Sequence, residues 1–200
     1  LKTLGKEIEH LHSKQSLLKT TAVQQCLLIA GVATFEYFKQ RNILPNYLAG
    51  HSVGAFSAAV AAEVLSFEEA LKIVTLRGQL MEAYDGSIYG MGVVIGMKEQ
   101  PLVEIVRATS TEQEPVYVSN RNAPTQLTLS GTKKGINNVF SKIEKLAKTK
   151  MLAVSTPSHC PLFKDISLKL HDELNNLALK SPKIPIISNV NARLLKDSES

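Results

Sequence analysis

The sequence contains no tryptophan, only two cysteines and no long hydrophobic run. The two cysteines, Cys26 and Cys160, are far apart, match no metal or redox spacing and are too few for a disulfide framework, so we expect a reducing, cytoplasmic setting. The longest apolar run, residues 26–33, is much shorter than the roughly 20 residues that a helix needs to span a bilayer. No basic-then-apolar leader stands at the start. We therefore expect neither membrane insertion nor secretion.

Charge is also modest, with 20% charged residues and a formal net charge of +5. A hydrophobic content of 44% is enough for a core and excludes a disordered chain, and no internal repeat is found. Lysines gather over residues 133–150, where apolar residues at helical spacing indicate that they form the solvated face of a helix. With only five arginines and no aromatic interleaving, nucleic-acid binding is not expected. The mild positive excess is compatible with anionic ligands.

The first part of the chain alternates helices with a short strand. Apolar periodicity predicts a helix from Thr20 or Thr21, either of which can cap it, to about Lys39. A short strand at residues 47–49 runs into a glycine-rich turn and an alanine-rich buried helix over residues 55–64. A further helix starts at a capping box, residues 66–69, and ends near Tyr84.

Residues 91–154 read as a separate subdomain. The predicted order is β-α-β-β-α-β, with strands at 93–95, 116–118, 126–129 and 151–154 and helices at 100–109 and 133–148. This is the split order of a ferredoxin-like module. A helix over 160–180 and a strand over 184–188 follow. The sequence thus predicts an α/β body of residues 1–90 and 155–200 that encloses a ferredoxin-like α+β insert.

Gly50-His51-Ser52-Val53-Gly54 fits the G-x-S-x-G nucleophile elbow, in which a strand turns sharply into a helix. The strained turn would expose the Ser52 hydroxyl, and the Val53 N–H at the helix N-terminus would stabilise an oxyanion. The pattern alone also occurs by chance, so an ordinary loop serine is the alternative. The predicted strand before it and helix after it favour the nucleophile.

A serine nucleophile needs a base, and His159 is the candidate. His10, His12 and His171 lie in polar helical stretches, and His51, inside the elbow, cannot reach round to Ser52. His159 follows a predicted strand and the 156–158 turn, a place where α/β active sites collect. The alternative is a histidine that caps the next helix. No acid between residues 52 and 159 makes a convincing third member, so a carbonyl or residues beyond 200 would orient the histidine.

Arg77 lies in a helix that is apolar on several sides, and arginine is rarely buried unless paired. Pointing inward, it would offer a planar two-pronged donor to a substrate carboxylate. Pointing outward, it would be a surface arginine whose stem covers apolar neighbours. The sequence leaves both open. Gly78 beside it permits close backbone packing.

Taken together, these residues resemble the malonyl-CoA:acyl-carrier-protein transacylase family, whose fold is shared with acyltransferase domains of polyketide and fatty-acid synthases. The matching segments occur in family order and lie at residues 50–54, 76–81, 90–97, 120–126, 130–131 and 157–162. The resemblance implies an α/β-hydrolase-like acyltransferase body. It also implies ping-pong transfer between coenzyme A and the prosthetic thiol of an acyl carrier protein, through a malonyl ester on Ser52 activated by His159. No metal or redox cofactor is implied.

The resemblance further implies that Arg77 pairs with the free malonyl carboxylate and that His51 and Asn122 lie near the substrate. Within the family, residues 21–24, 54–56 and 89–91 look more like the malonate decarboxylase epsilon subunit than the housekeeping enzyme of fatty-acid synthesis, which is the alternative. Other decarboxylase subunits would then be partners.

The family normally opens with a strand and a turn that donates the second oxyanion N–H, and closes with a segment that orients the histidine. Neither is among the 200 residues, so we expect the body to be incomplete at both ends. Two further hypotheses are a serine esterase or thioesterase, which would not need Arg77, and a carrier-protein docking subunit without catalysis.

Overall fold

The computed structural model describes Leu11 and residues 13–195, which form two compact units. One unit comprises Leu1–Gln79 and Lys169–Ser200, and the other comprises Leu80–Leu168. The boundaries expected from the sequence, 90/91 and 154/155, fall inside the second unit. The split pattern of strands and helices expected for residues 91–154 therefore lies wholly within that unit.

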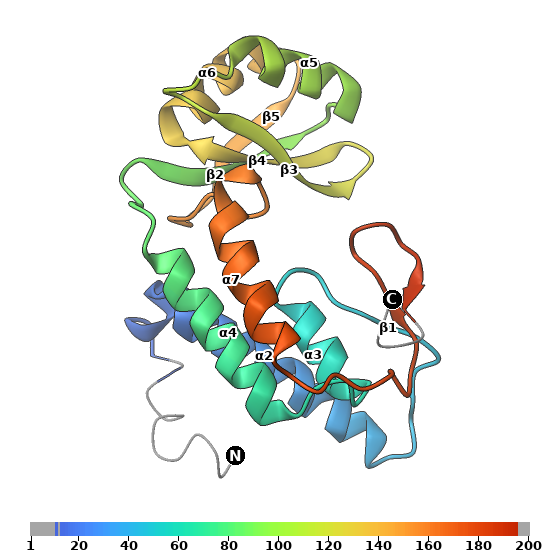
Figure 1. Ribbon diagram of the computed structural model, residues 1–200. Helices are drawn as coiled ribbons and strands as arrows, with labels where there is room; N and C mark the ends of the chain where they lie inside the picture. The colour runs from blue at the N-terminus through green and yellow to red at the C-terminus, as the bar shows by residue number, and fades with distance from the viewer. Residues whose placement is uncertain (1–10, 12, 196–200) are drawn as a thin grey trace. The chain divides into compact units, whose positions relative to one another are not determined.

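The first unit is mainly helical, and three of its helices share one hydrophobic core (Figure 1). They are α2 (Thr20–Lys39), α3 (Gly54–Ala61) and α4 (Phe67–Glu82), preceded by a short 3-10 turn, η2 (Ser16–Leu18). Their shared core contains Leu28 of α2, Val53 before α3, and Leu71 and Val74 of α4. The helix expected over residues 20–39 is confirmed. The expected threonine cap is wrong, because α2 already includes Thr20 and the cap position falls on Lys19, which makes no side-chain cap bond.

The start of α4 is fixed by the predicted capping box. The Ser66 N–H donates to Glu69 Oε2 at 2.8 Å, and the Glu69 N–H donates to Ser66 Oγ at 3.2 Å. Two backbone donors that the helix itself cannot satisfy are thereby paired. The box fixes the residue at which α4 begins, and with it the register of Arg77.

A small sheet completes the first unit. Its strands are β1 (Leu48–Ala49), β6 (Ile186–Ile187) and β7 (Leu194–Leu195), in the order β1-β6-β7. β1 and β6 are parallel, with Leu48 opposite Ile186. Ile186 packs with Ala58 and Ala62, so the helix that follows the turn covers the sheet. The carboxyl end of β1 leads directly into the turn that holds Ser52.

The second unit is a four-stranded antiparallel sheet with two helices on one face (Figure 1). The elements, in chain order, are β2 (Tyr89–Ile95), α5 (Glu99–Thr109), β3 (Val116–Ala123), β4 (Gln126–Thr132), α6 (Lys133–Ile143) and β5 (Lys148–Met151). The sheet order β3-β4-β2-β5 is the one that a split β-α-β-β-α-β chain produces. The ferredoxin-like prediction is confirmed. Leu127 and Leu129 of β4 face the helices and pack with Leu102, Ile136 and Val139.

Several element boundaries differ from the prediction; α6 ends at Ile143 and not at residue 148, and β3 runs on to Ala123. The last strand lies at Lys148–Met151 and not at residues 151–154, because the exposed positions of this edge strand are lysines and its apolar signal is weak. The helix expected over 160–180 is a 3-10 turn, η3 (Pro161–Phe163), followed by α7 (Lys164–Asn175). Pro161 occupies the first position of η3, where its missing N–H costs nothing.

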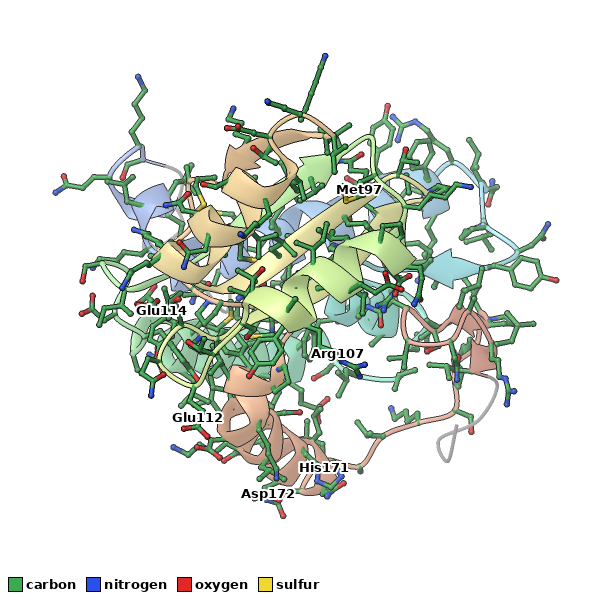
Figure 2. The ribbon with its side chains drawn as sticks, turned by 90° about the horizontal axis from the view of Figure 1, so that it is seen from above. Met97, Arg107, Glu112, Glu114, His171 and Asp172 are labelled. Carbon is green, nitrogen blue, oxygen red and sulfur yellow. The ribbon has the colours of Figure 1, made fainter. Side chains whose placement is uncertain are left out.

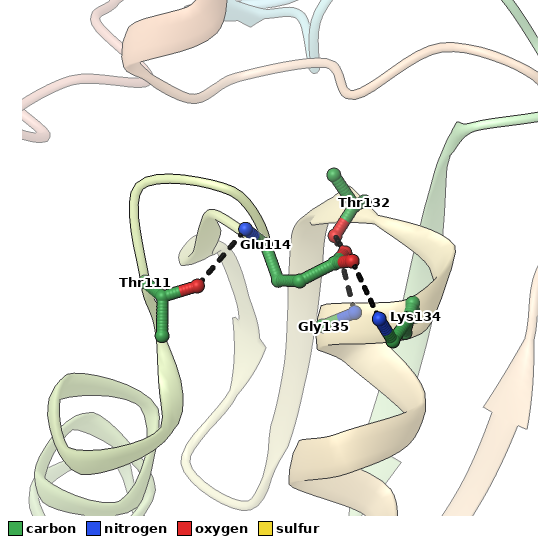
Figure 3. Close-up of polar contacts among 5 residues, drawn as sticks. All are labelled: Thr111, Glu114, Thr132, Lys134 and Gly135. Carbon is green, nitrogen blue, oxygen red and sulfur yellow. Dashed lines mark hydrogen bonds and ion pairs between the residues drawn. The ribbon is translucent and has the colours of Figure 1, made fainter.

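The N-terminus of α6 is capped by a threonine that sits in a small polar cluster (Figure 3). Thr132 Oγ1 accepts from the Gly135 N–H at 3.1 Å and donates to Glu114 Oε2 at 2.6 Å, while Lys134 Nζ lies 3.1 Å from Glu114 Oε1. These contacts lower the pKa of Glu114, first through the Thr132 hydrogen bond. Most lysines of residues 133–150 are exposed, as expected for a solvated face. Lys133 is the exception, because its Nζ donates to the Gly86 carbonyl at 2.5 Å.

Candidate active site

Ser52 lies in a sharp turn between β1 and α3. Its φ is +54°, in the left-handed region that residues other than glycine rarely adopt. Gly50 makes this turn possible, because a Cβ at that position would stand 2.1 Å from the carbonyl carbon of Gly54. Within the described part of the chain, nothing lies within 4 Å of a Cβ built on Gly54, so the close approach depends on Gly50. The predicted strand, turn and helix around Ser52 are confirmed.

The hydrogen bonds of the turn before α3 do not use the Val53 N–H. The Gly54 N–H donates to the His51 carbonyl at 2.9 Å, and the Ala55 N–H donates to the Ser52 carbonyl at 3.1 Å. The Val53 N–H donates no backbone hydrogen bond among the residues that the structure covers. Because a helix N-terminus carries partial positive charge, this amide is suited to an oxyanion that forms next to Ser52.

The strain at Ser52 predicts an unusual order of stability among variants. Neither Ser52→Gly nor Ser52→Ala has the hydroxyl, but only glycine adopts a positive φ freely, so we expect Ser52→Gly to be more stable by about 1 kcal/mol. Thermal unfolding of the two variants measures the difference. Ala55→Gly, inside α3, is the control and should lower stability, because glycine weakens an ordinary helix position. Equal stability of the two Ser52 variants would show that the turn is unstrained.

Arg77 of α4 points inward, so the surface alternative is wrong. Its Nη2 donates to Ser52 Oγ at 3.1 Å, and its Nη1 donates to Gln24 Oε1 at 2.5 Å. Burial lowers the pKa of the Arg77 guanidinium, but arginine stays protonated in proteins at neutral pH. The structure therefore places a fixed positive charge within hydrogen-bond distance of the Ser52 hydroxyl.

Close packing of α4 on α2 brings the guanidinium to this position. A Cβ on Gly78 would stand 2.4 Å from the Thr21 Cα, so the two helices approach more closely than any side chain would allow. One turn along, Gln25 Nε2 donates to Thr75 Oγ1 at 2.8 Å and fixes the register between the helices. The packing role expected for Gly78 is confirmed, and it sets where Arg77 lies.

A cavity of about 370 Å³ opens beside the elbow, within the first unit. Its lining includes His51, Gly50 and Val53 from the turn, and Phe35 from α2. His51 is exposed at this position. His51 thus borders this cavity, and its place near a bound substrate stays a prediction.

His159 and Asn122 belong to the second unit. His159 is exposed, follows the three buried residues 156–158, and has a φ of +60°. It ends a loop rather than a strand, because β5 stops at Met151, so the expected position at the carboxyl end of a strand is wrong. The capping alternative gains no support, since the cap position of η3 falls on Cys160 and no side-chain cap bond forms.

Asn122 lies in β3, in the irregular stretch before the hairpin, where the register of β3 against β4 shifts. Its Nδ2 donates to Thr128 Oγ1 at 3.3 Å, which ties the side chain to the neighbouring strand. Asn122 itself is exposed. The amide is thus presented on the surface of the second unit.

Neither His171 nor Cys160 competes with His159 and Ser52 for the roles of base and nucleophile. His171 is exposed on α7, next to Asp172, and shares a 3.0 Å contact with Asn175 (Figure 2). His10 and His12 lie outside the described residues. Burial raises the pKa of the Cys160 thiol to about 11, and its Sγ donates to the Pro157 carbonyl at 3.0 Å. Cys160 is therefore a neutral thiol at pH 7 and not a second nucleophile.

The described part of the chain contains neither a metal-binding cluster nor a membrane-spanning helix. No group of three or more His, Cys, Asp or Glu side chains there is arranged to hold a metal ion. None of the helices in the same part of the chain is both long and apolar enough to cross a membrane.

Comparison with known proteins decides the family. The model of the acyl transferase domain matches residues 4–200. The chain belongs to the acyl transferase family. A curated relative, the malonyl CoA-acyl carrier protein transacylase of Bacillus subtilis strain 168, is 34% identical over 186 residues, which cover 92% of this chain and 59% of the relative. The crystal structure of FabD from Acinetobacter baumannii superposes with a TM-score of 0.91 at 34% identity, covering 99% of this chain and 65% of that one. The expected acyltransferase fold with its small antiparallel subdomain is confirmed.

Another acyl transferase of known structure was solved with its carrier. It is described as a type II PKS acyl-carrier protein in complex with its malonyl-transacylase, and it matches with a TM-score of 0.91 at 31% identity, covering 99% of this chain and 66% of that one. These relatives give no support for the malonate decarboxylase epsilon subunit in particular. The present chain spans about three fifths of the length of the curated relatives it matches.

Two residues of this acyl transferase site were not predicted from the sequence. Gln24, which holds Arg77, is buried in α2, and a glutamine on the apolar stripe that contains Leu28 was the available signal. Asn189, after β6, donates from Nδ2 to the Gly50 carbonyl at 3.0 Å. No local pattern indicated Asn189, because its partner is far away in the sequence.

Proposed function

We propose that this protein transfers a malonyl group from malonyl-CoA to the thiol of an acyl carrier protein, through a malonyl ester on Ser52. One observation carries the proposal: a strained serine at a helix N-terminus lies 3.1 Å from a half-buried arginine that a glutamine holds in place. The serine supplies the nucleophile, and the arginine supplies a fixed charge for a carboxylate. Simple ester hydrolysis would not require the arginine.

In the first half-reaction, the His159 imidazole takes the proton of Ser52 Oγ as the oxygen attacks the thioester carbonyl carbon. The Val53 N–H donates to the resulting oxyanion. The carbon–sulfur bond then breaks, and coenzyme A leaves as its thiol with the proton that His159 held. The malonyl ester of Ser52 remains, and no electrons are exchanged with a cofactor.

Arg77 selects the acyl group in this scheme. The malonyl carboxylate is separated from the reacting carbonyl by one methylene, so it must lie close to Ser52 Oγ, where the Arg77 guanidinium is found. Gln24 holds Nη1, so Nη2, which here donates to Ser52 Oγ, is the group that would turn to the carboxylate of a malonyl ester. An acetyl group lacks this carboxylate and would leave the half-buried positive charge without a counter-charge.

The second half-reaction reverses the first with a different thiol. His159 takes the proton of the carrier's prosthetic thiol, the sulfur attacks the malonyl ester, and Ser52 Oγ leaves with the proton. The match to a malonyl-transacylase in complex with an acyl-carrier protein supports this acceptor. His51 and Asn122 would contact the substrate.

The named relatives are transacylases, which favours the housekeeping enzyme of fatty-acid synthesis as the physiological setting. The malonate decarboxylase epsilon subunit is the second candidate, supported by residues 54–56, where alanine and phenylalanine follow the elbow. The identity of the carrier protein that accepts the malonyl group would distinguish these two candidates. A cytoplasmic location fits both, and the two free cysteines support it.

The test is a transfer assay with malonyl-CoA and a holo acyl carrier protein, followed by the intact mass of the carrier. We expect the carrier to gain one malonyl group, and to gain acetyl groups only much more slowly from acetyl-CoA at the same concentration. Release of malonate or acetate without carrier labelling would indicate a thioesterase. Carrier binding without any acyl transfer would indicate a docking subunit.

A further inference from the structure

His159 is held in a conformation that needs external support. A left-handed backbone costs a residue with a side chain about 1–2 kcal/mol, and it persists only where the surroundings impose it. His159 has this backbone, with a φ of +60°, and its side chain is exposed. Thr156, Pro157 and Ser158, just before it, are buried. The contacts of this buried segment therefore decide where His159 lies.

Ser130 of β4 makes the decisive contact. It is fully buried on a central strand of the second unit, opposite Tyr117 of β3 and Met91 of β2. Side chains alternate along a strand, and Leu129 packs in the core with the helices, so Ser130 faces away from them. Its Oγ lies 2.6 Å from the carbonyl oxygen of Ser158, the residue before His159.

The direction of this hydrogen bond follows from proton counting. A hydroxyl carries one proton, and a carbonyl oxygen can only accept, so Ser130 donates to Ser158. Ser119 Oγ lies 2.8 Å from Ser130 Oγ as a second acceptor, and it donates its own proton to the Thr128 carbonyl at 3.1 Å. The Ser158 carbonyl is the nearer acceptor, at 2.6 Å, and because Ser130 is fully buried this bond is shielded from water.

A second anchor lies on the other side of His159. The Tyr84 hydroxyl donates to the Leu162 carbonyl, and its ring lies against Phe163 with centroids 5.0 Å apart. Burial is the main cause that raises the pKa of the Tyr84 hydroxyl, so the donor keeps its proton. The partner of Tyr84 is Leu162, which lies three residues after His159. Ser130 instead bonds the carbonyl of the peptide group that joins Ser158 to His159.

We infer that Ser130 is a positioning residue that fixes the catalytic histidine through the Ser158 carbonyl. This inference rests on the proposed role of His159 as the base. Without the Ser130 donor, the Ser158 carbonyl is left buried and unpaired, and the peptide that orients His159 rotates to find another partner. His159 then spends less time where it can take the proton of Ser52.

The experiment compares Ser130→Ala and Ser130→Cys with Ser119→Ala. Alanine removes the donor, cysteine keeps the shape but donates weakly, and Ser119→Ala removes a hydroxyl of the same network while leaving the bond to Ser158 in place. We expect both Ser130 variants to lose about tenfold in kcat with KM for malonyl-CoA within about twofold, because small misplacements of a catalytic group act on the chemical step. Ser119→Ala should keep the wild-type kcat.

A readout without substrate separates this inference from the proposed function. The imidazole NMR signals of His159, assigned with His159→Gln, should shift or broaden in Ser130→Ala, while those of His51 and His171 stay in place. An inactive wild-type protein would defeat the proposed function, and the NMR comparison would still test Ser130. Unchanged His159 signals, or an unchanged kcat with only a lower unfolding temperature, would overturn the inference and leave Ser130 a stability residue.

Discussion

Ser52→Ala is expected to abolish malonyl transfer, with a fall of at least about 10³-fold in the rate of exchange between malonyl-CoA and the carrier protein. The reason is that in the proposed mechanism the covalent ester forms on Ser52 Oγ, so the substitution removes the nucleophile. Cys160 is held as a neutral thiol, because burial raises its pKa to about 11. The rate of carrier malonylation, followed by intact mass, measures the effect.

The matched control is Ser141→Ala. Ser141 is an exposed serine on α6 whose Oγ donates only to the Asn137 carbonyl of its own helix, at 3.1 Å. Its replacement should leave the exchange rate unchanged. A Ser52→Ala variant that still transfers malonyl groups at an appreciable rate would refute the covalent mechanism.

Arg77→Ala is expected to remove the preference for malonyl over acetyl groups. Loss of a charge-assisted hydrogen bond to the carboxylate, worth about 1.5–3 kcal/mol, should lower kcat/KM for malonyl-CoA by roughly 10- to 150-fold. The slow reaction with acetyl-CoA should change by no more than about threefold, since that substrate never contacts Arg77 in the proposed scheme. Steady-state kinetics with the two thioesters give the ratio directly.

Two further variants sharpen this result. Arg77→Lys keeps the positive charge but loses the planar fork that reaches Gln24 and Ser52 together, so it should restore only part of the preference. Arg107→Ala removes an exposed arginine on α5 (Figure 2) and should leave the ratio unchanged. An equal loss with malonyl-CoA and acetyl-CoA in Arg77→Ala would mean that Arg77 supports the elbow and does not select the substrate.

Local patterns in the sequence predicted much of this structure. The G-x-S-x-G turn predicts a strained serine, since a strand that turns at once into a helix leaves few backbone conformations for the residue between. The box at Ser66 predicts the start of α4, since two adjacent polar side chains can satisfy the free amides of a helix end. The alternation of elements also predicts the ferredoxin-like order, because each connection is short.

The rest depended on contacts between distant residues, which local patterns do not encode. The inward orientation of Arg77 depends on two contacts with α2, which lies more than 50 positions earlier in the chain. Gly78 packs closely against Thr21, and Gln24 accepts a hydrogen bond from the guanidinium. The edge strand at Lys148–Met151 was not predicted at its correct position. Its exposed lysines give it little of the apolar pattern that indicates a strand, although it pairs with β2. The anchoring of the 156–158 segment by Ser130 likewise joins two segments that share no pattern.

The central claim is that a malonyl group is carried on Ser52 and held there by Arg77. Its most direct test is brief mixing of the protein with malonyl-CoA, acid quenching, and peptide mapping by mass spectrometry. We predict one malonyl group per protein on the peptide that contains Ser52, none in Ser52→Ala, and a sharply reduced yield in Arg77→Ala. An unmodified protein that nevertheless malonylates the carrier, or a malonyl group found on another residue, would contradict the account.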